Sequence, residues 1–192
     1  MNPKDYIAYN LFNILGVSEI TGYRETFIDQ QYRWLYDRIK PNTTVMDIGA
    51  ATGDTAIYFG MHPNAKRIYS WEPDKGQYNK FMKNAMKCKN RDIKNLTGFN
   101  KCFDWNDIKT AEMKTVAIKC DCEGAEFDIF DQNAPLDNVY AIMLEFHNQG
   151  VGQENLIINA LLEKGYEVEV KDKHYGAQFK HGIGMICAER VQ

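Results

Sequence analysis

The stretch VMDIGAATGDTAIYFG, residues Val45 to Gly60, decides the fold. An apolar run leads into Asp47, glycines follow at positions 49 and 53, and the residues after Asp54 have the apolar spacing of a helix. We interpret this as a strand, a tight loop and a helix. Glycine lets a ligand approach the backbone closely, and a helix start presents free N–H groups. A plain glycine turn explains the bend equally well, so the rest of the chain has to distinguish the two interpretations.

The remaining sequence alternates apolar runs with helical ones. Helical spacing is present twice before residue 43, over residues 7–15 and 28–39. The pattern predicts strands at 45–48, 68–71, 95–99, 115–121, 139–146, 166–170 and 183–191, and helices at 55–60, 73–87, 125–130 and 154–164. Pro73 fits the first turn of its helix, and Gly165 ends the last one.

Strands that alternate with helices predict an α/β fold with helices on both faces of a mostly parallel sheet. We expect a Rossmann-like three-layer sandwich with a seven-stranded sheet, a C-terminal antiparallel strand pair and preceding N-terminal helices. Residues 1–42 are expected to form a helical extension that covers the site. Residues 43–192 are expected to form the ligand-binding domain, as one structural domain.

Composition limits the class of partner. The chain has 192 residues, is 44% hydrophobic and carries a formal net charge of −3. This size suits one domain, and the charge gives no global attraction to nucleic acid or anionic lipid, so a small molecule is the default partner. The N-terminal residues have no long apolar core, so we expect neither a signal peptide nor a membrane span, and a cytoplasmic protein.

The five cysteines show no CxxC spacing, which disfavours a zinc or dithiol site. Reduced thiols are expected. Cys120 and Cys122 are two residues apart in an apolar run, so on a strand they face the same side. There we expect them to behave as small apolar side chains rather than as metal ligands.

The second predicted sheet strand ends at Glu72, which Pro73 follows. A carboxylate at this point can accept hydrogen bonds from the two hydroxyls of a ribose. The glycine loop reads GxxxG rather than the GxGxxG of dinucleotide sites, which disfavours NAD. Loop and acid together predict a nucleoside cofactor, although each alone has a structural explanation, such as a helix cap at Thr52 or Asp54.

Four motifs, in order across residues 43 to 190, resemble a known family. DIGAATGD resembles motif I of class I S-adenosylmethionine methyltransferases. IKCDCEGAEFDIF and MLEFHN resemble the KIDVEGAE and ExH segments of the FkbM-type enzymes, and WEPDKGQYNKFMKNA supplies the acid after the second strand. The resemblance implies an S-adenosylmethionine cofactor and methylation of a hydroxyl on a sugar or secondary metabolite. Ala51 departs from the asparagine usual in that family, and Cys120 and Cys122 depart from its usual apolar residues.

Position by position, the resemblance implies a set of cofactor-binding residues. The loop supplies its acids and glycines, the second strand supplies the ribose acid, and KCFDWND lies where the superfamily contacts adenine. The implied residues are Asp47, Gly49, Ala50, Gly53, Asp54, Glu72, Pro73, Asp104, Trp105 and Asp121.

Methyl transfer to a hydroxyl needs close positioning and benefits from a base. Asp121 ends the fourth sheet strand, and Glu145 and His147 alternate at the end of the fifth. His147, with an ordinary pKa near 6.5, is the predicted base, and Glu145 or Asp121 is predicted to orient it. Alternatively, Asp121 and Glu123 cap the next helix and His147 is a rim residue. A divalent cation held by Asp121, Glu145 and His147 is the third interpretation, and we expect no metal.

The expected acceptor is a small molecule or a glycan. Nucleic acid is disfavoured because the basic residues Lys80, Lys83, Lys87, Lys89 and Arg91 are explained by a solvated helix face, and no stacking-aromatic RNA motif accompanies them. Three alternatives stay open: the same fold acting on RNA or protein, a nucleoside-binding module without catalysis, and, last, a nicotinamide oxidoreductase. The short chain also suggests a homodimer in which a second subunit helps to cover the acceptor site.

Overall fold

The computed structural model describes residues 12–13, 16, 21–88, 93, 95–107, 113–148, 150–171, 173–174, 177–178 and 182–191. Most of the helix predicted over residues 7–15 lies outside this set, as do Lys89 and Arg91.

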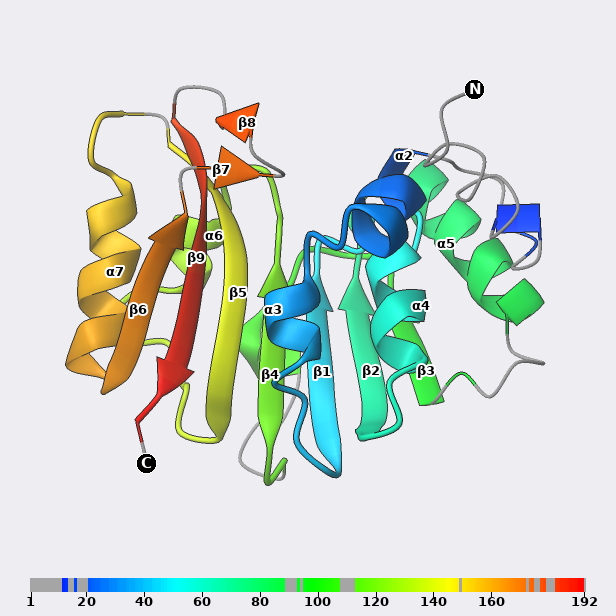
Figure 1. Cartoon of the computed structure of the whole chain (residues 1–192), viewed down its shortest axis with the longest axis horizontal. Helices are drawn as coiled ribbons and strands as arrows, with labels where there is room; N and C mark the ends of the chain where they lie inside the picture. Colours follow the sequence, from blue (N-terminus) through cyan, green and yellow to red (C-terminus); the bar gives the residue numbers. More distant parts are fainter. Residues whose placement is uncertain are drawn as a thin grey trace.

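A seven-stranded sheet forms the centre of the molecule, in the order β3-β2-β1-β4-β5-β9-β6 (Figure 1). The first five strands in that order are parallel, and β9 is antiparallel to both of its neighbours. This confirms the predicted fold, including the antiparallel pair. The bounds are β1 (Thr43–Ile48), β2 (Ala65–Trp71), β3 (Asn95–Phe99), β4 (Val116–Cys120), β5 (Val139–His147), β6 (Tyr166–Lys171) and β9 (Ile183–Arg190). Between β6 and β9, β7 (Lys173–His174) and β8 (Ala177–Gln178) form a separate two-stranded pair.

Helices cover both faces of the sheet because successive side chains of each buried strand point to opposite faces. On one face, Val45 packs in a cluster with side chains from α3 (Arg33–Tyr36), α4 (Asp54–Gly60) and α5 (Lys75–Cys88). On the other, Met46 packs in a cluster with side chains from α6 (Glu126–Ile129) and α7 (Glu154–Glu163). The predicted three layers are therefore present.

Two predicted helices differ from those observed. Within the range 28–39, where one helix is expected, α-helix is confined to α3, and two short elements come before it: α2 (Thr21–Tyr23) and a π-helix η1 (Arg24–Ile28). The cause is Gln30, whose φ of 57° places it in the left-handed region and breaks the helix. The second difference is at α5, which begins at Lys75 rather than Pro73, since the Asp74 carboxylate accepts the Gln77 N–H at 2.7 Å as a cap.

The strand order reverses beside β1, because the chain continues from β1 to β2 on one side and later adds β4 on the other. Ligands of open α/β sheets bind at the carboxyl ends of the strands near such a point. In Figure 1 these carboxyl ends are at the top of β1, β2 and β4. Among the described residues, no helix is both long and apolar enough to cross a bilayer.

Candidate functional site

The loop between β1 and α4 is held by close packing at its two glycines. Gly49 has a φ of 77°, and a Cβ added to it would lie 1.7 Å from the backbone oxygen of Asp121. Gly53 has a φ of 89°, and its added Cβ would lie 2.2 Å from the Phe81 ring. Both positions therefore need glycine for reasons within the protein, without a ligand. The loop is fixed between the end of β4 and helix α5.

A buried ion pair lies under this loop. Asp47 is fully buried, and its carboxylate accepts the Thr55 hydroxyl at 2.9 Å and lies 3.3 Å from Lys119 Nζ. Lys119 is 1% exposed, and its Nζ also donates to the Gly49 carbonyl at 2.6 Å. Burial raises the pKa of Asp47, and Lys119 opposes that rise. Burial alone would lower the pKa of Lys119, but the carboxylates of Asp47 and Asp121 bring it above the ordinary lysine value.

Glu72 connects the loop to the end of β2. It is 6% exposed, and its two carboxylate oxygens accept the Ala51 N–H at 2.9 Å and the Asp74 N–H at 2.8 Å. Burial raises the pKa of Glu72, and these two backbone donors oppose the rise. A carboxylate oxygen can accept two hydrogen bonds, so each oxygen retains an acceptor position for a further donor.

Asp104 and Trp105, the predicted adenine contacts, lie at the start of the 3-10 helix η2 (Trp105–Asp107). The Trp105 indole N–H donates to the Ile129 carbonyl at 2.9 Å, and its ring packs edge-on against Phe103. The exposed Asp104 accepts the Asn106 N–H at 2.8 Å. Both residues thus have structural partners, and their contact with adenine stays a prediction. Pro73 is exposed beside Glu72.

At the ends of β4 and β5, a single imidazole is surrounded by carboxylates. His147 Nδ1 is 2.8 Å from an oxygen of the buried Glu126, and its Nε2 is 3.5 Å from Glu123 and 3.8 Å from Glu145. The hydrogen bond to Glu126 is the main reason that the pKa of His147 is raised to about 9. The imidazole is then protonated at neutral pH. This corrects our expectation of a base with a pKa near 6.5, and the orienting carboxylate is Glu126 rather than Glu145 or Asp121.

The carboxyl group of Glu145 also has a raised pKa, which in an acid favours the neutral form. Burial, with the neighbouring Asp121 carboxylate, raises its pKa to about 7, although His147 opposes the rise. The Gln31 amide donates to Glu145 at 2.9 Å, and the Tyr32 hydroxyl donates to Asp121 at 3.4 Å. The segment before β1 therefore contacts both carboxylates at the strand ends.

Two alternative roles were predicted for this cluster: capping of the next helix and binding of a divalent cation. The N-cap of α6 is Ala125, with no side-chain cap hydrogen bond, so Asp121 and Glu123 do not cap it. For a cation, the nearest set of potential ligand atoms comes from Asp121, Glu123 and His147, which lie within 4.8 Å of one another, rather than the predicted set with Glu145.

Sequence reasoning missed several residues that hold the site together. Lys119 interrupts an apolar strand, and a lysine in such a position must be paired, so its signal was present in the sequence. Glu126 and Gln31 had no such signal. Thr26 is a further example: its hydroxyl donates to the buried Asp54, whose pKa burial raises to about 6.

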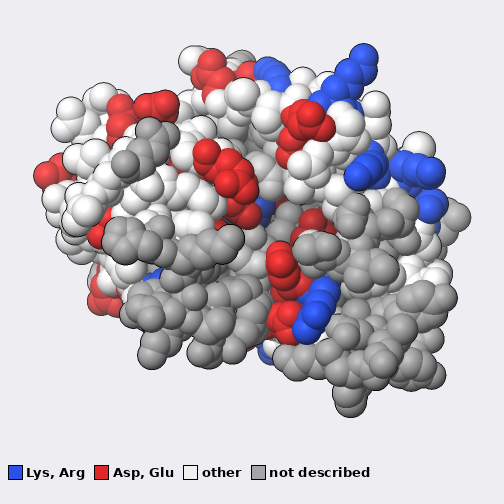
Figure 2. Space-filling model, turned by 90° about the horizontal axis from the view of Figure 1, so that it is seen from above, with Lys and Arg blue, Asp and Glu red and all other residues white. Residues whose placement is uncertain are grey.

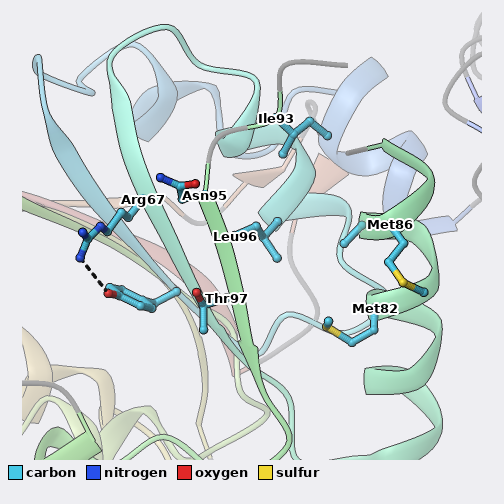
Figure 3. A pocket seen from close by; sticks show the side chains of 9 residues that line it. Arg67, Met82, Met86, Ile93, Asn95, Leu96 and Thr97 are labelled. Carbon is cyan, nitrogen blue, oxygen red and sulfur yellow. Dashed lines mark hydrogen bonds between the residues drawn. The ribbon is translucent and has the colours of Figure 1, made fainter. Parts of the chain in front are cut away.

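The described part of the surface over the strand ends is acidic around its middle. Figure 2 views the molecule from the carboxyl ends of the parallel strands and shows Asp and Glu gathered around the middle of this face, with Lys and Arg mainly toward the side of α5. A separate cavity of about 470 Å³ lies at the edge strand β3, near the amino ends of β2 and β3. Figure 3 shows Arg67, Asn95 and Thr97 on one side of β3 and Leu96, Met82 and Met86 on the other. This cavity is remote from the strand ends and contains none of the predicted site residues.

No family model matches the sequence, and no curated protein matches it. Solved structures do share its fold. An rRNA methylase from Streptococcus thermophilus has a TM-score of 0.57 at 12% identity, over 86% of this chain and 97% of that one. The human methyltransferase 10 domain containing protein has a TM-score of 0.62 at 12% identity, over 98% and 97%. An S-adenosylmethionine-dependent O-methyltransferase from Thermotoga maritima has a TM-score of 0.59 at 14% identity, over 95% and 70%. These similarities establish a Rossmann-like methyltransferase fold.

Proposed function

We propose that this protein is an S-adenosylmethionine-dependent methyltransferase that acts on a hydroxyl group of a small molecule or glycan, in the manner of the FkbM-type enzymes that its motifs resemble. One observation carries the proposal. On a methyltransferase fold, the glycine loop after β1, the acid after β2 and the acid–base cluster after β4 and β5 lie at the same edge of the sheet. Cofactor and acceptor would meet at this edge.

The residues at the first two strand ends fit this cofactor. Glu72 retains an acceptor position on each oxygen, which suits the two hydroxyl donors of a ribose. Asp121 follows β4 directly beside the glycine loop, since its backbone oxygen lies against Gly49, and its carboxylate is proposed to contact the cofactor there. Asp47 is fully buried, so its contribution is to fix the loop through Lys119 and Thr55.

The chemistry that S-adenosylmethionine supplies when bound is a methyl group on a positively charged sulfur. The protein must then hold the acceptor oxygen in line and remove its proton. Glu145 is the proposed base, because a carboxyl group with a pKa of about 7 is half ionised near neutral pH. Gln31 donates to one of its oxygens and orients it, and the protonated His147 stabilises the ionised form. Residues 1–42 are proposed to cover the acceptor, since Gln31 and Tyr32 already contact the cluster.

RNA is the second candidate acceptor, because Lys80, Lys83 and Lys87 form an exposed basic row on α5 and an rRNA methylase shares the fold. The acidic face in Figure 2 opposes it, since a phosphate backbone would approach carboxylates at the proposed point of transfer. Salt-sensitive binding of tRNA would favour this second candidate.

Calorimetric titration with S-adenosylmethionine, S-adenosylhomocysteine and NAD tests the proposal. We expect the first two to bind and NAD not to bind. Glu72→Ala should weaken both adenosyl ligands by about 1–3 kcal/mol, whereas the matched control Glu169→Ala, an exposed acid on β6, should leave their affinity unchanged. If neither adenosyl ligand binds the wild-type protein, the loop after β1 is only a turn and the proposal fails.

A further inference from the structure

Two cysteines at the end of β4 are in contact. Cys120 is the last residue of the strand and fully buried, whereas Cys122 is partly exposed just after it. Their Sγ atoms are 3.4 Å apart, with Asp121 between the two residues in sequence. The expectation that they face the same side is confirmed. The proposed methyl transfer uses neither thiol.

A separation of 3.4 Å is a non-bonded contact, from which a disulfide would require the two sulfurs to move closer. The bond requires an S–S distance of about 2.05 Å and Cα atoms about 4.4–6.8 Å apart. An extended chain advances about 3.3 Å per residue, which puts residues two apart at about 6.6 Å, near the upper limit. A modest contraction of the backbone around Asp121 would therefore allow the bond to form. All five cysteines lie among the described residues, and none is in a disulfide in this structure.

We propose that Cys120 and Cys122 are an oxidative modification site that forms an intrachain disulfide by exchange with a small-molecule disulfide such as oxidised glutathione. The Cys122 thiolate attacks one glutathione sulfur, so that a mixed disulfide forms and one glutathione thiolate leaves. Cys120 then loses its proton and attacks Cys122 Sγ, which releases the second glutathione thiolate. Two protein thiols are oxidised, one glutathione disulfide is reduced to two thiols, and the two protons pass to the released thiolates.

The order of attack follows from burial. Cys120 is fully buried, so its sulfur is shielded from a bulky reagent. Burial also raises the pKa of the Cys120 thiol well above its ordinary value, which makes this thiol a poor first nucleophile. Cys122 is the more accessible sulfur. Once the mixed disulfide has formed there, the second step needs no further reagent, because Cys120 is already beside it.

The disulfide has a structural consequence at the loop after β1. The ring that it closes contains Asp121, whose N–H donates to the Ile48 carbonyl at 2.9 Å and whose own carbonyl lies against Gly49. Contraction around Asp121 would move these groups relative to the loop. Glu123 and Gly124 follow with φ values of 56° and 110°, so the next segment is also in an uncommon conformation. Oxidation should therefore loosen the Ile48–Gly53 segment.

The test uses the full chain, equilibrated with mixtures of oxidised and reduced glutathione, quenched with acid and alkylated. We expect the loss of two hydrogen atoms per chain by intact mass before alkylation, protection from alkylation of the peptide that contains Cys120 and Cys122, and reversal by dithiothreitol. Cys102→Ser, which changes an exposed cysteine, should leave this behaviour unchanged, and Cys122→Ser should abolish it while the circular dichroism spectrum stays native.

Two results would overturn the proposed disulfide, and a third would overturn its proposed effect on the loop after β1. Full alkylation of both cysteines at every glutathione ratio would show that no disulfide forms. A stable glutathione adduct on Cys122 would show that Cys120 cannot close the bond. Unchanged amide hydrogen exchange at residues 48–53 in the oxidised protein would remove the proposed effect on the loop. These readouts involve neither cofactor nor methyl transfer, so their failure is distinguishable from failure of the proposed function.

Discussion

Replacement of Lys119 by methionine would test the buried ion pair that holds the loop after β1. The substitution keeps a long unbranched side chain and removes the charge, which leaves the fully buried Asp47 carboxylate without its cation. Breaking a buried pair on one side costs about 3–5 kcal/mol. The Thr55 and Ser70 hydroxyls still donate to Asp47, so we expect the lower value, about 3 kcal/mol in the free energy of unfolding.

Urea unfolding followed by circular dichroism measures this loss. The double variant Asp47→Asn, Lys119→Met should regain at least about 1 kcal/mol relative to Lys119→Met, because no unpaired charge remains. Lys171→Met, which breaks a partly exposed pair with Glu169, should cost less than about 1 kcal/mol. A loss below about 1 kcal/mol in Lys119→Met, or no recovery in the double variant, would refute the assignment of Lys119 as the residue that stabilises the loop.

Three further predictions concern the cluster at the ends of β4 and β5. Transfer of labelled methyl groups to a pool of metabolites should rise as pH increases through about 7, where Glu145 ionises among Asp121, Glu123, His147 and Lys119. Glu145→Gln should lower the rate of transfer at least about 100-fold and leave cofactor affinity intact. Full activity in this variant would end the role of Glu145 as base. His147→Gln should flatten the pH dependence of the free energy of unfolding. Because the pKa of His147 is raised to about 9, its contribution to stability is complete below about pH 6.5 and is lost as pH rises through 9. A variant that keeps the wild-type slope between these pH values would contradict the pairing of His147 with Glu126. Treatment with a chelator should leave methyl transfer unchanged, whereas a loss restored by magnesium would identify Asp121, Glu123 and His147 as cation ligands.

The sheet could be predicted because its buried strands are apolar and are separated by turn and helix signals that depend on local sequence. Val45, Met46 and Ile118 show this, since each is buried where the pattern expects a strand. The segment before β1 shows the limit of the same signal. Helical spacing relates Tyr32, Leu35 and Ile39, and all three are buried in one cluster. The helix predicted over residues 28–39 is nevertheless interrupted near its start, at Gln30. Periodicity predicted which side chains are buried without determining the backbone that carries them.

The candidate site was less predictable because its chemistry depends on pairs that the fold brings together. Glu126 reads as a surface residue of a short helix, but α6 places it, fully buried, against His147 at the end of another element. That single contact changes the protonation state on which the predicted base depended. Asp121, Glu145 and His147 were correctly expected to lie at adjacent strand ends, since parallel strands end at one edge, but their roles required the side-chain partners.

The placement of β9 has a consequence for the order in which the protein acquires its structure. β9 lies between β5 and β6 and pairs with both, although it follows both in the chain. During synthesis, β5 therefore emerges from the ribosome with one edge unpaired, and β6 has no strand to pair with until β9 has been made. The nascent chain can assemble β1 to β5 around their helices first, and β9 must then insert as a bridge. The open edge of β5 is where a stalled or truncated chain would be exposed to aggregation.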